Sequence, residues 1–451
     1  MKKRQIVVVG GIAAGTSAAA KAARFNPHAE VILLEQSETI SYGVCEIPYL
    51  IAGEIKEEEK LVIFSPEKFS RQKGVTVKTL HKVEKIIPNK RKLVVRDLNK
   101  SEFKEFSYDK LIITTGALPK KLNIAGEDSG NVFPVRSRDN AKNILKYLQT
   151  ENPKKIAIIG GGFIGIEMAE AFRKLEKEVT LIHQFSLPLE ILEDETRECV
   201  LKELTANGVN FIGNVKTEAF ITSKKGKVEY VITNKGTFET DLVIVAIGVD
   251  SNVALAKTAG LRLGKTGALF VNNLQRTSND NIFAAGDCCE VKNIVNGKMS
   301  YIPLATIAAR AGRVAGENAA GGNTKFDGAI YSVAVRVFNL EIARVGLSSA
   351  EASQIYKIVT ETIVSDSKIP FMPGNKKITL KLIIDQISKR IIGANIYGEA
   401  GAALRANTLA IAIQNKMTIN DLAHSDLIYS PPFAPLWDPI LVAANQVMKK
   451  L

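Results

Sequence analysis

Cysteine is scarce in this chain, with four among 451 residues: Cys45, Cys199, Cys288 and Cys289. None of them has a partner at the spacing of a C-x-x-C or C-x4-C pair, and the neighbours Cys288 and Cys289 are too close to form an easy disulfide. This pattern excludes the disulfide framework of small secreted domains. It favours a reducing compartment and predicts a cytoplasmic location.

Long apolar runs are also missing. No stretch of 18 apolar residues occurs, so no membrane-spanning helix is predicted. The first apolar run, residues 6–9, is broken at once by Gly10 and Gly11 and is too short for the apolar core of a signal peptide. We therefore expect a soluble protein without a membrane partner.

The chain has no arginine-rich tract and no interleaving of aromatic with basic residues, although its formal net charge is +13. Its lysines are scattered, so solvated faces are expected to account for most of this charge and anionic cofactors or substrates for the rest. Nucleic acid is not an expected partner. No residue cluster predicts a metal site.

What the sequence does contain is a strand, a glycine-rich turn and a helix at its start. Residues 6–9 form a β-branched run, and Gly10, Gly11 and Gly15 follow it before an alanine-rich helix to about Arg24. A second apolar strand, residues 31–34, ends at Glu35. Such a turn binds a pyrophosphate at the helix N-terminus, and the acid accepts ribose hydroxyls. Isoleucine replaces the middle glycine of G-x-G-x-x-G, so the prediction rests on this context.

A second dinucleotide-binding motif is complete. Residues 155–159 form a strand, Gly160, Gly162 and Gly165 form G-x-G-x-x-G, and residues 179–182 form the next strand. Two such units imply two cofactors, one able to reduce the other. His183 and Gln184 stand where an NAD-selective site has a carboxylate. They are either a neutral strand end or an absence of repulsion against a 2′-phosphate, and on the second interpretation we expect both NADH and NADPH to be used.

A single cysteine lies ten residues beyond Glu35, in Ser41-Tyr-Gly-Val-Cys45-Glu-Ile-Pro-Tyr49. A lone cysteine is usually a small buried apolar residue. Its place just after the first unit instead allows a thiol beside the redox ring of a bound dinucleotide. A reactive thiol must ionise, so we expect positive potential or a helix N-terminus to lower its pKa.

Ser17, Lys21 and Arg24 fall at i, i+4 and i+7 on the first helix and form one polar stripe among alanines. The stripe is either a solvated face or a phosphate-binding strip.

The chain length suggests several domains, and the motifs divide it in three. We expect an α/β protein with two Rossmann-like dinucleotide-binding domains and a C-terminal α+β dimerisation domain. The first dinucleotide-binding domain takes residues 1–117 and 252–325, the second residues 118–251, and the interface domain residues 327–451. Residues 118–132 are predicted to be a linker. Residues 429–439 hold four prolines and three aromatics, which suits an interface or an active-site wall.

With these motifs in order, the chain resembles the FAD-dependent pyridine nucleotide-disulfide oxidoreductases along its whole length. The resemblance rests on the two glycine turns, on Thr115-Gly116 after a buried strand, and on Ala285-Gly286-Asp287. Within that group, the segments 41–49 and 429–433 are similar to those of coenzyme A disulfide reductases and their persulfide-reducing relatives. NADH oxidases and NADH peroxidases share the architecture.

The resemblance implies FAD in the domain of residues 1–117 and 252–325 and NAD(P)H in the domain of residues 118–251. It also implies a homodimer, coenzyme A as substrate or ligand, and Cys45 as the redox cysteine. It implies that Tyr429 reaches the site from the partner subunit, where it is our candidate proton donor. The implied coenzyme A positions are Ser17, Lys21, Arg24, Ser41, Lys73 and Trp437. The implied cofactor positions are Gly10, Gly11, Ala13, Ala14, Gly15, Glu35, Gln36, Val83, Thr115, Gly116, Gly160, Gly162, Phe163, Ile164, Gly165, Glu167, His183, Gly248, Gly286, Asp287, Pro303, Leu304, Ala305 and Phe433.

The sequence also departs from the family pattern. Val44 replaces the usual asparagine before the cysteine, and Phe371-Met372 lacks a tyrosine hydroxyl. Ala13 stands where peroxidase-type relatives have a histidine. Three functions stay open: a reductase of coenzyme A disulfide or small persulfides, an NAD(P)H oxidase or peroxidase that cycles through a Cys45 sulfenic acid, and a flavoprotein redox sensor or electron-transfer partner.

Overall fold

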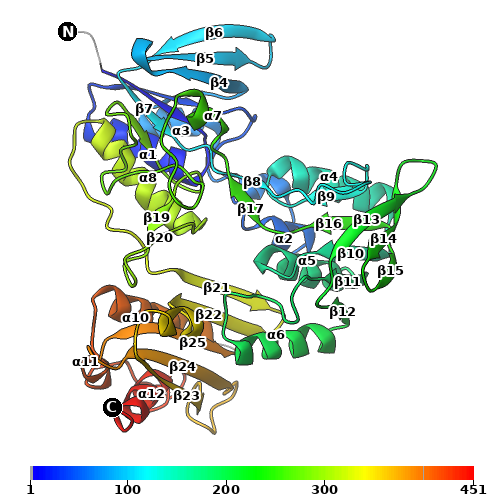
Figure 1. Ribbon diagram of the computed structural model, residues 1–451, viewed down its shortest axis with the longest axis vertical. Helices are drawn as coiled ribbons and strands as arrows, with labels where there is room; N and C mark the ends of the chain where they lie inside the picture. The colour runs from blue at the N-terminus through cyan, green and yellow to red at the C-terminus, as the bar shows by residue number, and fades with distance from the viewer. Residues whose placement is uncertain (1–3, 400) are drawn as a thin grey trace.

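Two parallel sheets and one antiparallel sheet organise the chain, as Figure 1 shows for residues 4–399 and 401–451 of the computed structural model. The first parallel sheet has the strand order β18-β7-β1-β2-β3. Its strands are β1 (Gln5–Val9), β2 (Glu30–Leu34), β3 (Thr76–Lys78), β7 (Lys110–Ile113) and β18 (Ile282–Ala284). Both faces are covered, because Ile6 and Val8 pack in one core cluster and Val7 and Val9 in another.

Small residues let two helices pack closely on this sheet. Helix α1 (Ala13–Phe25) lies along α8 (Ala305–Ala319). A Cβ added at Gly312 would overlap the carbonyl oxygen of Ala14, and one at Gly316 would overlap that of Ala18. The alanine and glycine content of both helices therefore sets their close approach, which fixes the position of the first glycine turn.

The region between β2 and β7 carries short helices and a second, antiparallel layer. The helices are α2 (Ile47–Ile51), the 3-10 turn η1 (Glu58–Leu61) and α3 (Pro66–Lys73). After β3, the strands β4 (His81–Ile87), β5 (Lys92–Asp97) and β6 (Glu102–Ser107) form a three-stranded sheet, with the 3-10 turn η2 (Pro88–Lys90) between β4 and β5. Figure 1 shows this sheet at the outer end of the molecule.

The second parallel sheet has the strand order β12-β11-β10-β16-β9. Its strands are β9 (Val132–Pro134), β10 (Lys155–Ile159), β11 (Glu178–Ile182), β12 (Val209–Ile212) and β16 (Leu242–Val245). Its helices are α4 (Arg138–Glu151), α5 (Phe163–Lys174) and α6 (Asp194–Ala206). A small antiparallel sheet of β13 (Thr217–Thr222), β14 (Val228–Thr233) and β15 (Gly236–Glu239), which the sequence did not predict, interrupts it.

The chain passes between the two parallel sheets twice, and the two passes pair with each other. Strand β8 (Ala117–Pro119) runs antiparallel to β17 (Val249–Ser251). The predicted linker at residues 118–132 is therefore not wholly irregular. Its first residues satisfy their backbone hydrogen bonds on the returning segment.

The C-terminal region is an antiparallel sheet with helices on it, in the order β21-β22-β25-β24-β23. Its strands are β21 (Ser332–Val337), β22 (Leu340–Gly346), β23 (Ile358–Asp366), β24 (Lys377–Asp385) and β25 (Ile391–Gly398). Its helices are α9 (Ser349–Ser353), α10 (Ala402–Gln414), α11 (Ile419–Ala423) and α12 (Pro439–Met448). Before it come α7 (Ala254–Thr258) and the short strands β19 (Val291–Lys292) and β20 (Met299–Ser300). The α/β class expected from the sequence is confirmed.

None of the helices in the described part of the chain is both long and apolar enough to cross a membrane.

Candidate functional site

The Cys45 loop is tied to the first glycine turn by backbone hydrogen bonds. Ser41, at φ +50°, donates its N–H to the carbonyl of Gly11 over 2.8 Å. The carbonyl of Ser41 accepts the N–H of Ile63 over 2.8 Å, and Gly43 donates to Leu61 over 2.9 Å. The loop therefore has little freedom to move away from the glycine turn.

Cys45 lies just before α2 and is exposed at the protein surface. Enough protein still surrounds the thiol for burial to raise its pKa, and the negative charges of Glu46 and Glu167 raise it further. Arg136 opposes them without reversing the shift. The expectation of a lowered pKa is therefore wrong for the protein groups around Cys45, because burial and the neighbouring carboxylates outweigh Arg136.

Glu167, one of the carboxylates that act on Cys45, lies on α5. Burial raises its pKa to about 7, with a further contribution from Glu170, while Arg336 opposes the shift. Arg336 comes from β21 and lies 3.0 Å from Glu170 Oε1 and 2.6 Å from Glu54 Oε1. Its guanidinium also lies 5.2 Å from the centre of the Tyr49 ring. All three sheet regions thus meet beside the cysteine loop.

A second arginine, between β9 and α4, reaches the turn after β18. Arg136 Nη2 donates to Asp287 Oδ2 over 2.8 Å. The neighbouring Gly286 has φ +86°, and a Cβ there would press on Ala14 at the start of α1. Tyr301 Oη is buried near Asp287 and has no hydrogen-bond partner among the described residues. This polar group without a partner, beside a close backbone approach, fits a bound polar cofactor.

The first glycine turn has the shape that a pyrophosphate site requires. Gly10 has φ +103°, and a Cβ there would overlap the carbonyl of Thr114. A Cβ at Gly15 would overlap the carbonyl of Gly10. Glu35 is buried, and its Oε2 accepts the N–H of Gly11 over 2.7 Å. The residues present therefore fit a dinucleotide.

The second glycine turn repeats this construction. Gly160 has φ +111°, a Cβ at Gly160 would overlap the carbonyl of Ala246, and one at Gly165 would overlap the carbonyl of Gly160. His183 takes the place of the acid, because its Nδ1 accepts the N–H of Gly161 over 3.0 Å. Its Nε2 lies 2.7 Å from Oε1 of Glu190.

The predicted phosphate stripe is partly engaged by the protein itself. Lys21 Nζ lies 2.6 Å from Glu317 Oε2 on α8, and both side chains are largely shielded from solvent. Arg24 is exposed on the same face. Lys73, at the end of α3, lies 5.3 Å above the ring of Phe64. An anion bound at Lys21 therefore has to compete with Glu317.

The C-terminal aromatics are exposed: Tyr429 by 49%, Phe433 by 70% and Trp437 by 60%. Arg405 holds this segment, with Nε 2.8 Å from Asp438 Oδ2 and Nη2 3.3 Å from the Phe433 carbonyl. Figure 1 shows α11 and α12, which flank this segment, apart from α2, which follows Cys45. Within one chain, these residues do not join the cysteine loop.

Most other predicted cofactor positions lie at turns near the two glycine motifs. Thr115 donates its hydroxyl to the Asn252 carbonyl over 2.7 Å, and Gly116 has φ +68°. Pro303 and Leu304 lead into α8, which begins at Ala305, and Gly248 has φ +100° before β17. The remaining positions are the buried Val83 on β4, the exposed Gln36, and, at the start of the two helices, Ala13, Ala14, Gly162, Phe163 and Ile164.

The sequence did not indicate several residues of this site. Arg136, Arg336, Thr114, Tyr301 and Glu190 belong to no motif, and each is brought in by the fold from a distant or irregular segment. Thr114 offered a weak signal as the neighbour of Thr115, and its hydroxyl donates to the Val9 carbonyl over 2.7 Å. The described residues contain no group of three or more His, Cys, Asp or Glu that could hold a metal ion.

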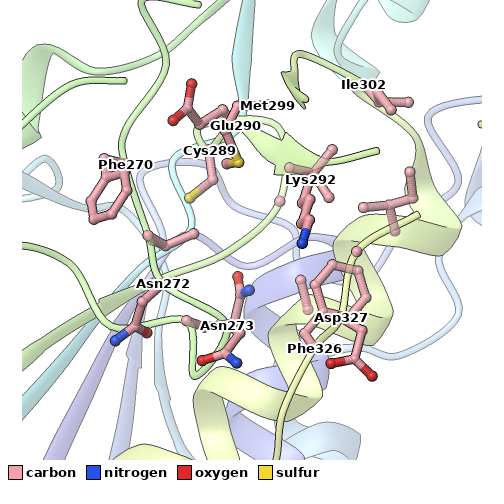
Figure 2. Close-up of a pocket in the computed structure, with 17 residues that line it drawn as sticks. Phe270, Asn272, Asn273, Cys289, Glu290, Lys292, Met299, Ile302, Phe326 and Asp327 are labelled. Carbon is pink, nitrogen blue, oxygen red and sulfur yellow. The ribbon is translucent and has the colours of Figure 1, made fainter. Parts of the chain in front are cut away.

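A separate cavity of ≈ 210 Å³ lies between α8 and the loops around residues 270–275 and 289–292, as Figure 2 shows. Cys289 lines it, and its Sγ lies 3.7 Å from Sγ of Cys288. Both thiols are free and buried. Gly286 is the one predicted cofactor position among the described residues that line it. The cavity is thus distinct from the Cys45 loop.

Comparison with known proteins agrees with this geometry. Residues 4–312 match the family described as "Pyridine nucleotide-disulphide oxidoreductase", and residues 332–439 match its dimerisation domain. The "NAD(P)H sulfur oxidoreductase (CoA-dependent)" of Pyrococcus furiosus is 36% identical over 446 residues, which cover 99% of each chain.

Two solved structures share the fold. An NAD-dependent persulfide reductase from A. fulgidus superposes with a TM-score of 0.95 at 34% identity, over 99% of this chain and 83% of that one. A water-forming NADH oxidase from Lactobacillus brevis superposes with a TM-score of 0.94 at 30% identity, over 99% of each.

Proposed function

Because this chain belongs to the pyridine nucleotide-disulphide oxidoreductase family, we propose that it uses NAD(P)H and FAD to reduce coenzyme A disulfide or small persulfides and polysulfide through Cys45. The observation that carries the proposal is the position of Cys45. It is the exposed thiol among the four free cysteines, and its loop is hydrogen-bonded to the first glycine turn through Ser41 and Gly11.

The two turns divide the cofactors between them. The turn from Gly10 to Gly15, with Glu35 and Asp287, would hold FAD, and the turn from Gly160 to Gly165, with Glu167, would hold NAD(P)H. When bound, FAD takes a hydride from the nicotinamide and supplies an electron pair to sulfur. The protein's part is to orient both dinucleotides and to present one thiol.

Cys45 acts as a thiolate nucleophile. Its sulfur attacks one sulfur of the substrate, so that a Cys45–S bond forms as the substrate S–S bond breaks. The leaving thiolate takes a proton, for which we propose Tyr429 of the partner subunit as donor. Over the full cycle, RSSR, NAD(P)H and one proton give two RSH and NAD(P)⁺. The mixed disulfide on Cys45 is the oxidised resting form.

Glu167 controls the charge beside this thiol. With a pKa of about 7, its carboxyl holds a proton in a large part of the molecules at neutral pH. Its negative charge raises the pKa of Cys45, so protonation of Glu167 favours the Cys45 thiolate. Because Glu167 belongs to the proposed NAD(P)H site, its protonation links that site to the ionisation of the Cys45 thiol.

Coenzyme A would bind on the stripe of α1. Lys21, Arg24 and Lys73 supply cations for its phosphates, Ser17 and Ser41 supply hydroxyls, and Trp437 of the partner subunit lines the pocket. The ion pair between Lys21 and Glu317 competes with a phosphate for Lys21 and so weakens phosphate binding there.

A second candidate function is an NAD(P)H oxidase. The observation that favours it is the exposure of the Cys45 thiol, which oxidants can reach. Such an enzyme would pass through a Cys45 sulfenic acid, formed when the thiolate attacks one oxygen of a peroxide, the O–O bond breaks and the other oxygen leaves as hydroxide. Turnover of a small disulfide without oxygen distinguishes the reductase from this oxidase and from a redox sensor.

The test is anaerobic turnover of coenzyme A disulfide by Cys45→Ser, with Cys199→Ser as the matched control. Cys199 is a partly buried thiol on α6. We expect Cys45→Ser to keep its flavin and its reduction by NAD(P)H but to lose disulfide turnover, while Cys199→Ser behaves like the wild type. Unchanged turnover of coenzyme A disulfide by Cys45→Ser would refute the proposal.

A further inference from the structure

The two glycine turns differ in the residue that accepts their second N–H group. In the first turn, Gly11 donates to the carboxylate of Glu35 over 2.7 Å. In the second, Gly161 donates to His183 Nδ1 over 3.0 Å. Because Nδ1 accepts this bond, the proton of the neutral imidazole is on Nε2. His183 therefore takes the place of the acid after β11. Unlike an acid, it has a hydrogen-bond donor, Nε2–H, on the side of the ring away from Gly161.

That N–H meets a carboxylate from further along the chain. His183 is 5% exposed, and Nε2 has no regular hydrogen bond among the described residues, although Glu190 Oε1 lies 2.7 Å from it. The loop that delivers Glu190 is anchored, since Leu189 donates its N–H to the Gly161 carbonyl over 3.0 Å. Arg197 also donates to the carbonyls of residues 187 and 188.

We propose that Glu190, positioned by His183, is the carboxylate that selects NADH over NADPH. It accepts a hydrogen bond from the adenosine ribose of NADH and repels the 2′-phosphate of NADPH. The inference rests on the proposed function only in taking the second turn as the nicotinamide dinucleotide site.

The charges around the loop favour this assignment. Residues 183–193 contain no lysine or arginine. Of the nearby cations, Arg197 is bound to loop carbonyls and to Asp194, and Lys235 donates to the Gly213 carbonyl over 3.1 Å. Glu193 is neutralised by Lys381 over 2.7 Å. A 2′-phosphate at Glu190 would therefore meet a carboxylate, while Arg197, Lys235 and Lys381 are already engaged by other groups.

Glu190 is ionised at neutral pH. Burial alone would raise its pKa, but the contact with His183 and a backbone hydrogen bond outweigh burial and lower it. The expectation that both nucleotides are used rested on the lack of an acid at residues 183–184. The fold supplies that acid seven residues later.

The experiment is rapid-mixing reduction of the holoenzyme's flavin by NADH and by NADPH, with no disulfide present. Flavin reduction does not depend on the disulfide acceptor. The nucleotide proposal can therefore be refuted while disulfide reduction through Cys45 is upheld, and disulfide reduction can be refuted while the nucleotide proposal is upheld. We expect the wild type to favour NADH by about tenfold or more, and Glu190→Gln to lose about tenfold of that preference. Glu198→Gln, an exposed carboxylate on α6, is the charge-matched control and keeps the wild-type ratio. A wild type that favours NADPH, or an unchanged ratio in Glu190→Gln, would overturn the proposal.

A second pair of variants tests the positioning role of His183. In His183→Gln the amide oxygen can still accept from Gly161 and the amide nitrogen can still reach Glu190, so we expect the nucleotide preference to persist. His183→Leu can do neither and should lose the preference for NADH. The loss should appear mainly in the dissociation constants of NADH and NADPH and not in the limiting rate of flavin reduction. Equal behaviour of the two variants contradicts the positioning role, and the Glu190→Gln result stands even if His183→Leu fails to fold.

Discussion

Replacing Glu167 with glutamine should remove a pH-dependent loss of stability. The pKa of Glu167 is raised from its usual 4.5 to about 7. Between these values the folded protein holds a proton that the unfolded chain has released. The contribution of Glu167 to stability is therefore fully present below about pH 4.5 and is lost as the pH rises through about 7.

The size of this effect follows from the shift. Each pKa unit corresponds to about 1.4 kcal/mol, so the rise to about 7 corresponds to about 3 kcal/mol between the two ends of the titration. Glu167→Gln has no charge to bury and should lack this slope. The variant should also lower the pKa of the Cys45 thiol, because Glu167 is one of the groups that raise it.

The assay is urea unfolding of the holoenzyme, followed by circular dichroism at about pH 5 and about pH 8. From about pH 5 to about pH 8, Glu167 should cost the wild type about 2.5 kcal/mol of unfolding free energy, and Glu167→Gln should lack this loss. Glu178→Gln, an exposed carboxylate at the start of β11, is the control. Alkylation of Cys45 by iodoacetamide as a function of pH checks the thiol. If Glu167→Gln leaves both the stability difference and the alkylation profile unchanged, the reasoning is refuted.

The remaining predictions concern the substrate and the assembly. Lys21→Ala with Arg24→Ala should raise KM for coenzyme A disulfide by about tenfold to a hundredfold while flavin reduction by NAD(P)H stays unchanged, because both cations belong to the proposed coenzyme A site and not to the nicotinamide site. Glu317→Gln should lower the same KM by freeing Lys21, and a wild-type KM in both variants would leave the stripe as a solvated face. The protein should sediment as a homodimer through its C-terminal region, where Phe433 and Trp437 are exposed, and a single active 49.0 kDa species would contradict this.

The glycine turns could be predicted from sequence because their geometry leaves few alternatives. Gly10 and Gly160 need positive φ, and Gly15 and Gly165 need close backbone contact, so each position is confined to glycine. The flanking apolar strands follow from burial on both faces of a parallel sheet. Most of the α/β fold could therefore be predicted from the sequence.

The electrostatics of the site could not be predicted from the sequence, because they depend on contacts between distant segments. Arg136 comes from the segment between β9 and α4 and Arg336 from β21, and nothing in the sequence near them points to Cys45. The pKa of Cys45 was expected to be lowered, yet burial with Glu46 and Glu167 raises it. Glu190 was missed for the same reason, since an irregular loop brings it back to His183.

The measurement that tests the central claim most directly is the mass of the protein after reaction with its substrate. The holoenzyme is reduced with NADH without oxygen, the nucleotide is removed, and a single equivalent of coenzyme A disulfide is added. We predict one coenzyme A moiety, attached to the peptide that contains Cys45 and released by a second addition of NADH. A protein that gains no such mass, or that carries it on Cys199, Cys288 or Cys289, would contradict the account.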